Sequence, residues 1–313
     1  MKILFIDSWN NVGDFFRFHR SKVKNLDNFG LYKNDSFFNK LFRYMGLHIY
    51  KPFLFFSYGN WKKNIKNYDM FIIESRKTFE YLINYINKKC PEKRIVVWYW
   101  NEVTSRELDP NYIRKKYHCE TWTFDLNDAK RYNMNFNDTY YFDDIDLKSS
   151  EYVKNDLFYV GIDREGRIEL LEEIKNKLQS IKKSYSFFLT VSPIKPAQKN
   201  YNYSDKMLYD EVVENIKHTR AILDLTKQTQ YGLTLRPMEA IFFKKKLITN
   251  NENIVKYDFY NPKNILIYNN NTTCEEIREF LESEYEPIKT SIIEFYKFEN
   301  WLKRIVEFKG AKK

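Results

Sequence analysis

Cysteine, glycine and proline are all scarce in this sequence of 313 residues, which holds three cysteines, eight glycines and eight prolines. The cysteines, Cys90, Cys119 and Cys274, are odd in number and widely spaced, so they indicate free thiols and not a disulfide framework or a zinc site. The low glycine and proline content excludes a fibrous chain. With 43% apolar and 18% aromatic residues, the composition is that of a globular protein.

Long apolar runs are missing as well, and none approaches the ~20 residues that a membrane-spanning helix needs. The opening MKILFID is too short and too weakly charged at its start to be a secretory signal. We therefore expect a cytoplasmic protein. The four histidines are scattered and have no carboxylate at zinc-ligand spacing, so they indicate no zinc site. We expect no bound metal and no cofactor.

The net charge of +10 is concentrated in one part of the chain. Residues 16–66 hold eleven Lys or Arg and two acidic residues, a local balance of 11 − 2 = +9, and they are dense in aromatics. Basic residues interleaved with Phe, Tyr and Trp suit an anionic membrane surface or a lipid-linked phosphate, and they also suit single-stranded nucleic acid. A pair of amphipathic helices with a solvated basic face is the third interpretation.

The chain length allows two domains of about 150 residues, each large enough for its own core. Buried parallel strands are predicted at 2–7, 69–75, 94–102 and 121–125, and again at 156–161, 186–193, 221–225 and 264–269. Helical patterns lie between them. We predict an α/β protein with two Rossmann-like, doubly wound parallel sheets and a domain boundary near residue 150.

The strongest local pattern is residues 221–251, AILDLTKQTQYGLTLRPMEAIFFKKKLITNN, which predicts one βαβ unit. Its polar loop places backbone N–H groups and the positive end of a helix beyond the first strand, where open α/β sheets hold phosphates. Gln230, Thr234 and Arg236 precede the predicted helix, and Pro237 fits its first position. An arginine fork suits a pyrophosphate, and Glu239 suits the two hydroxyls of a ribose, so both side chains are expected to face a solvent-filled cleft. The plainer alternative is that Glu239 complements the helix dipole and Arg236 is solvated.

The run GLTLRPMEAIFFKKKLITNN, about a tenth of the chain, resembles the donor-binding motif of GT-B glycosyltransferases. It looks most like bacterial enzymes of capsule and lipopolysaccharide assembly. In that family a glycine-containing turn (here Gly232), a Thr, a Glu in the next helix and a KKLI-type strand hold the nucleotide of an activated sugar. Many retaining members carry a second glutamate eight residues upstream, and that position is Tyr231 in this chain, so the resemblance favours an inverting enzyme.

The resemblance implies a hexosyl- or N-acetylhexosaminyltransferase that moves a sugar from a nucleotide-sugar donor to a lipid-linked or oligosaccharide acceptor of surface-glycan synthesis. The expected organisation is an acceptor-side domain at 1–150, a donor-binding domain at 151–287 and a C-terminal helix at 288–313 that braces the N-terminal domain. The two domains of a GT-B protein face each other across a cleft. We expect such an enzyme to lie peripherally on the inner face of the plasma membrane, without nucleic acid as a partner.

Further candidate residues follow from the positions of loops and strand ends. Gly161 and Arg164 follow the first strand of the second half, where the resemblance implies basic contacts to donor phosphates. Lys195 lies in a later loop and is a further candidate for such a contact. For the base that deprotonates the acceptor hydroxyl, Glu74 and Glu102 end two predicted strands. The loop after the first strand, SWNNVGDFF, lacks the three-glycine dinucleotide fingerprint, which argues against a nicotinamide or flavin enzyme. Asp14 in this loop is the third candidate, because the resemblance places it where GT-B enzymes shape the acceptor side of the cleft.

Asp144 and Asp146 form the Asp-x-Asp pattern that holds a metal in GT-A glycosyltransferases. A single such pair in a linker is a weak signal. A manganese-dependent GT-A enzyme and a module that binds single-stranded nucleic acid remain the two alternatives to the GT-B interpretation.

Overall fold

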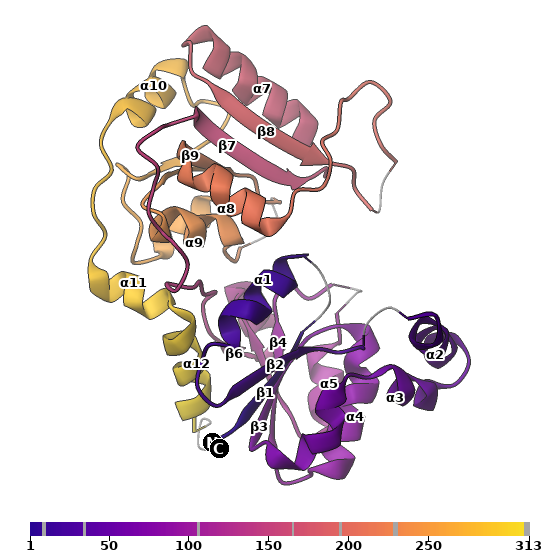
Figure 1. Ribbon diagram of the computed structural model, residues 1–313. Helices are drawn as coiled ribbons and strands as arrows, with labels where there is room; N and C mark the ends of the chain where they lie inside the picture. The colour runs from indigo at the N-terminus through magenta and orange to yellow at the C-terminus, as the bar shows by residue number, and fades with distance from the viewer. Residues whose placement is uncertain are drawn as a thin grey trace. The chain divides into compact units, whose positions relative to one another are not determined.

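The computed structural model describes residues 1–7, 11–33, 36–104, 107–164, 166–193, 196–227 and 231–309. They form two compact units, Met1–Asp138 and Thr139–Lys313, and each unit has its own parallel β-sheet (Figure 1). The division therefore comes earlier than the predicted boundary near residue 150. Residues just after it belong to the second unit because the rings of Tyr140 and Phe142 pack against that of Phe298, with centroids 4.8 and 5.5 Å away.

The first unit has a six-stranded sheet in the order β2-β1-β3-β4-β5-β6. The strands are β1 (Ile3–Asp7), β2 (Leu26–Gly30), β3 (Met70–Glu74), β4 (Arg94–Tyr99), β5 (Glu120–Thr123) and β6 (Asn135–Phe136). All the pairings are parallel, and Leu4 and Ile6 of β1 lie opposite Phe71 and Ile73 of β3. Every residue of β1 and β3 is buried, which explains their continuous apolar runs.

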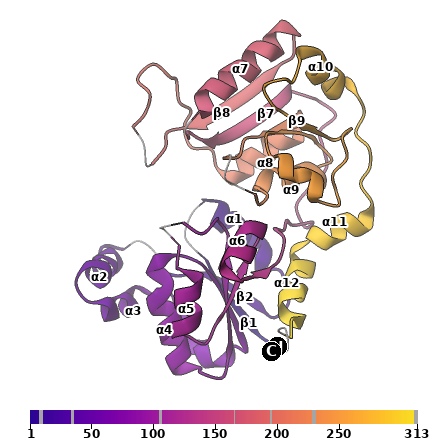
Figure 2. The ribbon, with the colours of Figure 1, turned by 180° about the vertical axis from the view of Figure 1, so that it is seen from behind.

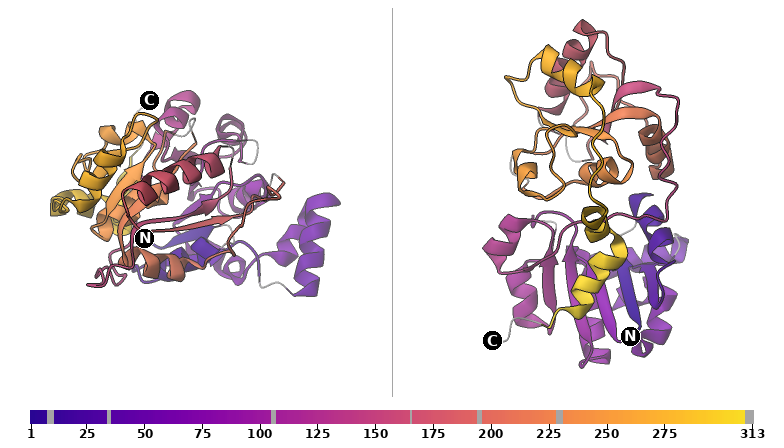
Figure 3. Two further views of the ribbon diagram at one scale, coloured as in Figure 1. Left: turned by 90° about the horizontal axis from the view of Figure 1, so that it is seen from above. Right: turned by 90° about the vertical axis from the view of Figure 1, so that its left-hand side faces the viewer.

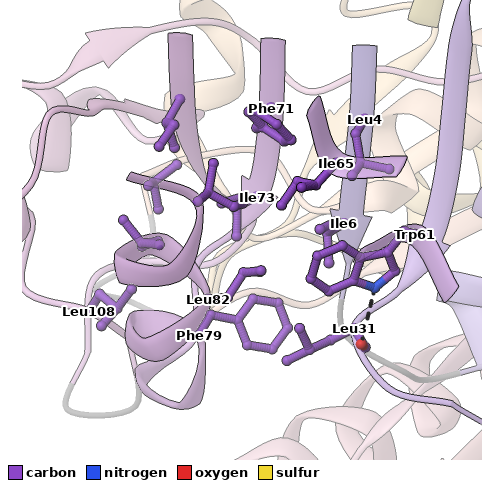
Figure 4. Close-up of a cluster of buried hydrophobic side chains, with 14 of the residues drawn as sticks. Leu4, Ile6, Leu31, Trp61, Ile65, Phe71, Ile73, Phe79, Leu82 and Leu108 are labelled. Atoms are coloured by element: carbon purple, nitrogen blue, oxygen red, sulfur yellow. Dashed lines mark hydrogen bonds between the residues drawn. The ribbon is translucent and has the colours of Figure 1, made fainter. Parts of the chain in front are cut away.

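Helices lie on either side of the first sheet (Figure 3). They are α1 (Asn11–Arg20), α2 (Phe37–His48), α3 (Leu54–Ser57), α4 (Glu80–Lys89), α5 (Pro110–Lys116) and α6 (Leu126–Tyr132), with 3-10 segments η1 (Lys51–Phe53), η2 (Asn60–Asn67) and η3 (Lys77–Phe79). Leu82 of α4 and Trp61 of η2 pack with Leu4, Ile6 and Ile73 in the buried cluster of Figure 4. The Trp61 indole Nε1–H donates to the Leu31 carbonyl at 3.2 Å, so this ring is fixed as well as buried.

The second unit has a five-stranded sheet in the order β11-β10-β9-β7-β8, and all its pairings are parallel. The strands are β7 (Asn155–Ile162), β8 (Tyr185–Thr190), β9 (Thr219–Asp224), β10 (Lys246–Thr249) and β11 (Ile265–Ile267). The helices are α7 (Arg167–Ser180), α8 (Tyr209–Lys217), α9 (Leu235–Phe242), α10 (Cys274–Glu282), α11 (Thr290–Tyr296) and α12 (Phe298–Glu307), with the 3-10 segment η4 (Glu252–Lys256).

Two pairs of helices cover the two faces of this second sheet. Leu171 and Ile174 of α7 form one buried cluster with Ile277 of α10 and with Leu223 and Ile248 of the strands. Helices α8 and α9 lie on the other face (Figures 1 and 2). Both units are therefore doubly wound parallel α/β structures, and the predicted fold class is confirmed.

The predicted C-terminal helix is interrupted. Its apolar period runs on from 288 to 308, but the helix ends at Tyr296 and a new one begins at Phe298. The break comes from Tyr141, whose N–H donates to the Tyr296 carbonyl at 2.9 Å and whose carbonyl accepts from the Phe298 N–H at 2.9 Å. Periodicity cannot reveal such a break, because its cause lies far away in the sequence. The bracing role predicted for this helix stays a prediction.

The structure also bears on the cysteines and on membrane-spanning helices. All three cysteines are free thiols, as their spacing predicts. None of the described helices has both the length and the hydropathy that crossing a bilayer requires.

Candidate functional site

The loops after β7 and β9 flank the topological switch point of the second sheet. Strand β8, which follows β7 in the chain, pairs with one edge of β7, and the next strand, β9, pairs with the other edge. Ligands of open α/β sheets bind at such a point, beyond the carboxyl ends of the strands. The predicted donor-binding residues that the structure describes come from β7 and the loop after it, and from the loop after β9 and the helix α9 that follows.

Asp224 anchors the beginning of α9 at this edge. It is the last residue of β9, it is 2% exposed, and its carboxylate accepts from the hydroxyls of Thr234 (2.7 Å) and Thr249 (2.8 Å). Burial raises the pKa of Asp224, against the opposing effect of these two hydrogen bonds. Thr234 in turn caps α9 by accepting from the Arg236 N–H at 3.1 Å. One buried carboxylate therefore fixes the position of the helix N-terminus, although the sequence analysis did not single it out.

The sequence predicted Pro237 at the first position of this helix. The helix begins at Leu235, so Pro237 is its third residue. The position still lies in the first turn, where the missing proline N–H has no intrahelical partner to lose. Gly232 is buried ahead of the cap. Gln230 and Lys195, both predicted to bind the donor, lie outside the described residues.

Glu239 does not face solvent, and that part of the expectation is wrong. Its side chain is fully buried: one oxygen accepts from the Tyr209 hydroxyl at 2.6 Å, and the other pairs with the Arg236 guanidinium. The Tyr209 hydroxyl also lies 2.9 Å from that of Tyr141. Since Tyr209 donates its proton to the carboxylate, Tyr141 must donate to Tyr209. Burial raises the pKa of both tyrosines well above the usual value and also raises that of Glu239, which Arg236 opposes.

The Arg236 guanidinium can still bind an anion at this edge of the sheet. Its side chain is 17% exposed, and one of its nitrogens pairs with Glu239. A guanidinium has five N–H donors in a planar fork, so an arginine held by one carboxylate can still present donors to a second anion. The pairing with Glu239 gives Arg236 a fixed orientation, and its role in donor binding stays a prediction.

The loop after β7 is tied to the loop after β9. Arg167, the first residue of α7, donates to the Ile162 carbonyl at 2.9 Å and to the Leu225 carbonyl. Gly161 lies in β7, where an added Cβ would come within 2.2 Å of the Tyr159 hydroxyl, so a side chain there would displace that ring. Arg164 is half-buried in the following loop. The structure therefore places Gly161 and Arg164 beside the switch point and gives Arg167 a structural role.

The first unit has its own switch point, between β1 and β3, and acidic residues end both strands. Asp7 is 2% exposed and pairs with Arg17 and, at 2.7 Å, with Arg20. Burial raises the pKa of Asp7, the two arginines oppose this, and the charge of Glu74 adds to it. Asp7 was not among the predicted site residues, although its place at the end of the first strand is the same signal that selected Glu74.

The three candidate bases differ in their surroundings. Asp14 lies in the first turn of α1, is 64% exposed and pairs with Arg17. Glu74 ends β3 and pairs with Arg76 at 3.2 Å, and Arg76 also binds the buried Glu107 at 2.6 Å. Glu102 is half-buried and lies three residues beyond the end of β4 at Tyr99, not at the strand end that was predicted.

Asp146 is engaged in a local turn. One of its oxygens accepts from the Lys148 N–H at 3.2 Å and the other pairs with Lys217 at 2.9 Å. Within the described part of the chain, no three His, Cys, Asp or Glu side chains gather as a metal-binding group. The Asp144/Asp146 pair therefore has no third ligand of these types among the described residues.

No known family profile matches this chain, and no curated protein matches it. Among solved structures, it is similar to a lipopolysaccharide outer core galactosyltransferase, WaaB, with 13% identity and a TM-score of 0.45 over 98% of each chain. An α1,3-fucosyltransferase matches at 11% identity and a TM-score of 0.47, over 99% of this chain and 91% of the other. The glycotransferase of kitacinnamycin matches at 8% identity and a TM-score of 0.47, over 96% and 95%.

Proposed function

We propose that this protein is a GT-B glycosyltransferase that transfers a sugar from a nucleotide-sugar donor to an acceptor of surface-glycan synthesis. The observation that carries the proposal is the switch point of the second unit. There the sequence that resembles the GT-B donor motif forms a capped helix N-terminus with Arg236 oriented beside it. Helix dipole and guanidinium together favour a pyrophosphate at this position. The buried Glu239 acts through Arg236 and does not bind ribose directly.

In the proposed reaction, the acceptor oxygen attacks the anomeric carbon and the bond from that carbon to the nucleotide diphosphate breaks. A carboxylate takes the acceptor proton, and Arg236 with the α9 N-terminus stabilises the leaving diphosphate. We favour Asp14 as the base because its carboxylate is exposed, whereas Glu74 is nearly buried. The reaction inverts the anomeric centre and uses no metal, so turnover should persist in excess chelator. Loss of turnover in chelator and its recovery with manganese would favour the Asp144/Asp146 alternative.

The test of the donor site is binding of nucleoside diphosphates in thermal-shift and calorimetric titrations. A ligand at a hundredfold excess over Kd stabilises by about 2.7 kcal/mol, which a thermal shift detects. Arg236→Lys keeps the charge beside Glu239 but loses the planar fork, and it should weaken binding about tenfold. Arg278→Lys is the matched control, because Arg278 pairs with Glu275 at the same i,i+3 spacing and both side chains are exposed. Equal affinities of both variants would refute the assignment of Arg236.

The test of the base is turnover. Asp14→Asn should lower kcat by about 10²–10⁴-fold while nucleotide affinity stays unchanged. Glu74→Gln and Glu102→Gln serve as the two comparisons. A large loss in either of them, with Asp14→Asn active, would transfer the role of base to that residue.

We further propose that the first unit holds the enzyme at an anionic membrane, in the cytoplasm. Eight large apolar side chains between residues 37 and 56 are 41–75% exposed: Phe37, Phe38, Leu41, Tyr44, Leu47, Ile49, Tyr50 and Phe56. Helix α2 contributes five of them and has Lys40 and Arg43 but no acidic residue. Contiguous apolar surface of this kind beside basic side chains is typical of interfacial helices.

Vesicle co-sedimentation tests this membrane proposal. Phe37→Ser with Leu41→Ser should reduce binding to anionic vesicles, whereas Tyr152→Ser, which alters a residue 70% exposed in the second unit, should not. Lys62 is a poor choice for substitution, because its ammonium group binds the Phe55 carbonyl and lies 4.1 Å from the centre of the Phe55 ring, so a change there would also disturb packing. A protein that ignores anionic vesicles but binds single-stranded oligonucleotides near physiological salt would favour the nucleic-acid alternative.

A further inference from the structure

A chain of buried hydrogen bonds in the second unit ends at Arg236. The Tyr141 hydroxyl donates to that of Tyr209 at 2.9 Å, and Tyr209 donates to Glu239 at 2.6 Å. Glu239 in turn pairs with Arg236. The two tyrosines and Glu239 are buried, whereas the Arg236 side chain is 17% exposed. Of these four groups, the guanidinium is therefore the one that can meet a ligand.

Glu239 joins the two ends of this chain because both of its oxygens are used. Oε1 accepts from Tyr209, and Oε2 accepts from Arg236. The terminal torsion of a glutamate is soft by itself, so a carboxylate with one partner can still turn. When one oxygen is held, the planar group cannot turn and the position of the other oxygen is fixed as well. The Tyr209 hydroxyl therefore determines where the Arg236 guanidinium is held.

Tyr141, at the far end of the chain of hydrogen bonds, is fixed through its backbone and its ring. Its N–H donates to the Tyr296 carbonyl and its carbonyl accepts from the Phe298 N–H, both at 2.9 Å. Its ring packs edge-on against Phe242 in the last turn of α9, with centroids 5.3 Å apart. The hydrogen bonds therefore connect Arg236, in the first turn of α9, to the junction of α11 and α12 and to the segment that opens the second unit.

A polar network of this kind is a costly way to fill a core. Buried hydroxyls and carboxylates lose their contacts with water, and hydrogen bonds inside the protein roughly offset that loss without a large gain. Apolar side chains could fill the same space, as Phe242 and Phe243 do beside Tyr141. The network differs from ordinary packing in that it ends on a cation at the switch point of the sheet, where ligands of open α/β sheets bind.

We propose that Tyr209 and Tyr141 are positioning residues of the donor site, which act through Glu239 on the orientation of Arg236. In this arrangement neither tyrosine contacts the diphosphate, and both raise its affinity by holding the guanidinium in one place. The inference rests on the proposed function, because it needs a diphosphate on Arg236. Through Tyr141 it also links donor affinity to the segment by which the chain enters the second unit.

Calorimetric titration with ADP, CDP, GDP, TDP and UDP, well below the unfolding temperature, tests this role. Tyr209→Phe keeps the ring and removes the hydroxyl, and it should weaken binding of the tightest of these probes about three- to tenfold. Tyr141→Phe leaves the bond from Tyr209 to Glu239 in place and should weaken binding by less, about twofold. Tyr68→Phe is the matched control, because Tyr68 is also buried and donates to a carboxylate, that of Asp27, at 2.7 Å in the first unit.

A double-mutant cycle separates positioning from a purely structural role, since changes in groups that act through one another are not additive. Tyr209→Phe should lose most of its effect on affinity in the Arg236→Lys background, even though it still lowers Tm. Such a loss, with Tyr68→Phe unchanged in affinity, supports the inference. Tyr141→Phe carries the same cycle if Tyr209→Phe does not fold.

Two kinds of failure can be told apart. If Arg236→Lys weakens binding but Tyr209→Phe does not, or if the two changes are fully additive, the positioning role is overturned and the donor site stands. If none of the five nucleotides binds, or if Arg236→Lys leaves affinity unchanged, the proposed donor site is overturned and the positioning role with it.

Discussion

Replacement of Glu239 by alanine offers the sharpest check of the site geometry. The change removes a fully buried carboxylate that accepts from Tyr209 and pairs with Arg236. Tyr209 is 4% exposed, so its hydroxyl would lose its acceptor inside the protein. The guanidinium of Arg236 would lose its counter-charge while it is largely shielded from water. If Glu239 instead pointed into a solvent-filled cleft, as the sequence alone suggested, the same change would have little effect on folding.

The expected loss can be worked from these contacts. Removing one partner of a buried ion pair costs about 3–5 kcal/mol, and an orphaned buried hydroxyl costs about 1–3 kcal/mol. The two losses share the same group and do not add, so we expect about 3–5 kcal/mol. For a unit of this size each kcal/mol lowers Tm by about 2–4 °C, which gives a fall of roughly 6–20 °C.

Calorimetric unfolding measures this change, with separate transitions fitted if the two units unfold independently. Glu239→Gln keeps an oxygen acceptor for Tyr209 and should lose less stability than Glu239→Ala. Glu275→Ala is the control, because Glu275 makes an i,i+3 pair with an arginine at 58% exposure. Exposed pairs of this kind contribute about 0–1 kcal/mol. A Tm of Glu239→Ala within the range of the Glu275→Ala control would refute the buried network.

Two further predictions concern the cores of the units. Ile73→Ala in the cluster of Figure 4 should lower the free energy of unfolding by about 2–5 kcal/mol. Val255→Ala, at an exposed position, should lower it by less than about 0.5 kcal/mol. Equal effects of the two changes in denaturant titrations would contradict the packing of Ile73. Burial lowers the pKa of Lys245 to about 8. The unfolded chain therefore binds more protons between pH 8 and 10.5, and stability rises with pH through that window. Lys245→Met should reduce this rise in the free energy of unfolding by up to on the order of 3 kcal/mol. Lys303→Met, at an exposed position, should leave the rise unchanged. An unchanged rise in Lys245→Met would refute the lowered pKa of Lys245.

The strands that the sequence predicted well are those buried on both faces. KILFID and DMFIIES became β1 and β3, because a strand covered on both sides reads as one continuous apolar run. Strand β2 has the sequence LDNFG, which mixes polar and apolar residues at an edge of the sheet, and it was missed inside the basic region.

The candidate site was predicted in part. The loop after β9 was recognisable from its glycine, its threonine cap and the helix that follows. The orientation of Glu239 was not, because Tyr209 lies 30 residues earlier and Tyr141 lies 68 residues before Tyr209. For Asp224 the sequence predicted the position but not the contacts. It lies near the end of a predicted strand, but only the structure reveals that two hydroxyl groups donate to its two oxygens.

The apolar surface on and after α2 has a practical consequence for work with the purified protein. Gly46 is the buried residue of α2, and a Cβ there would come within 2.6 Å of Leu54, so the helix is held at its glycine while its apolar side chains stay outside. In buffer without lipid or detergent, these side chains are left to associate with the same surface of another copy. We therefore expect elution volumes in size-exclusion chromatography to depend on protein concentration and on added detergent. An apparent dimer obtained in such buffer would reflect the missing amphiphile and not an assembly of the cell.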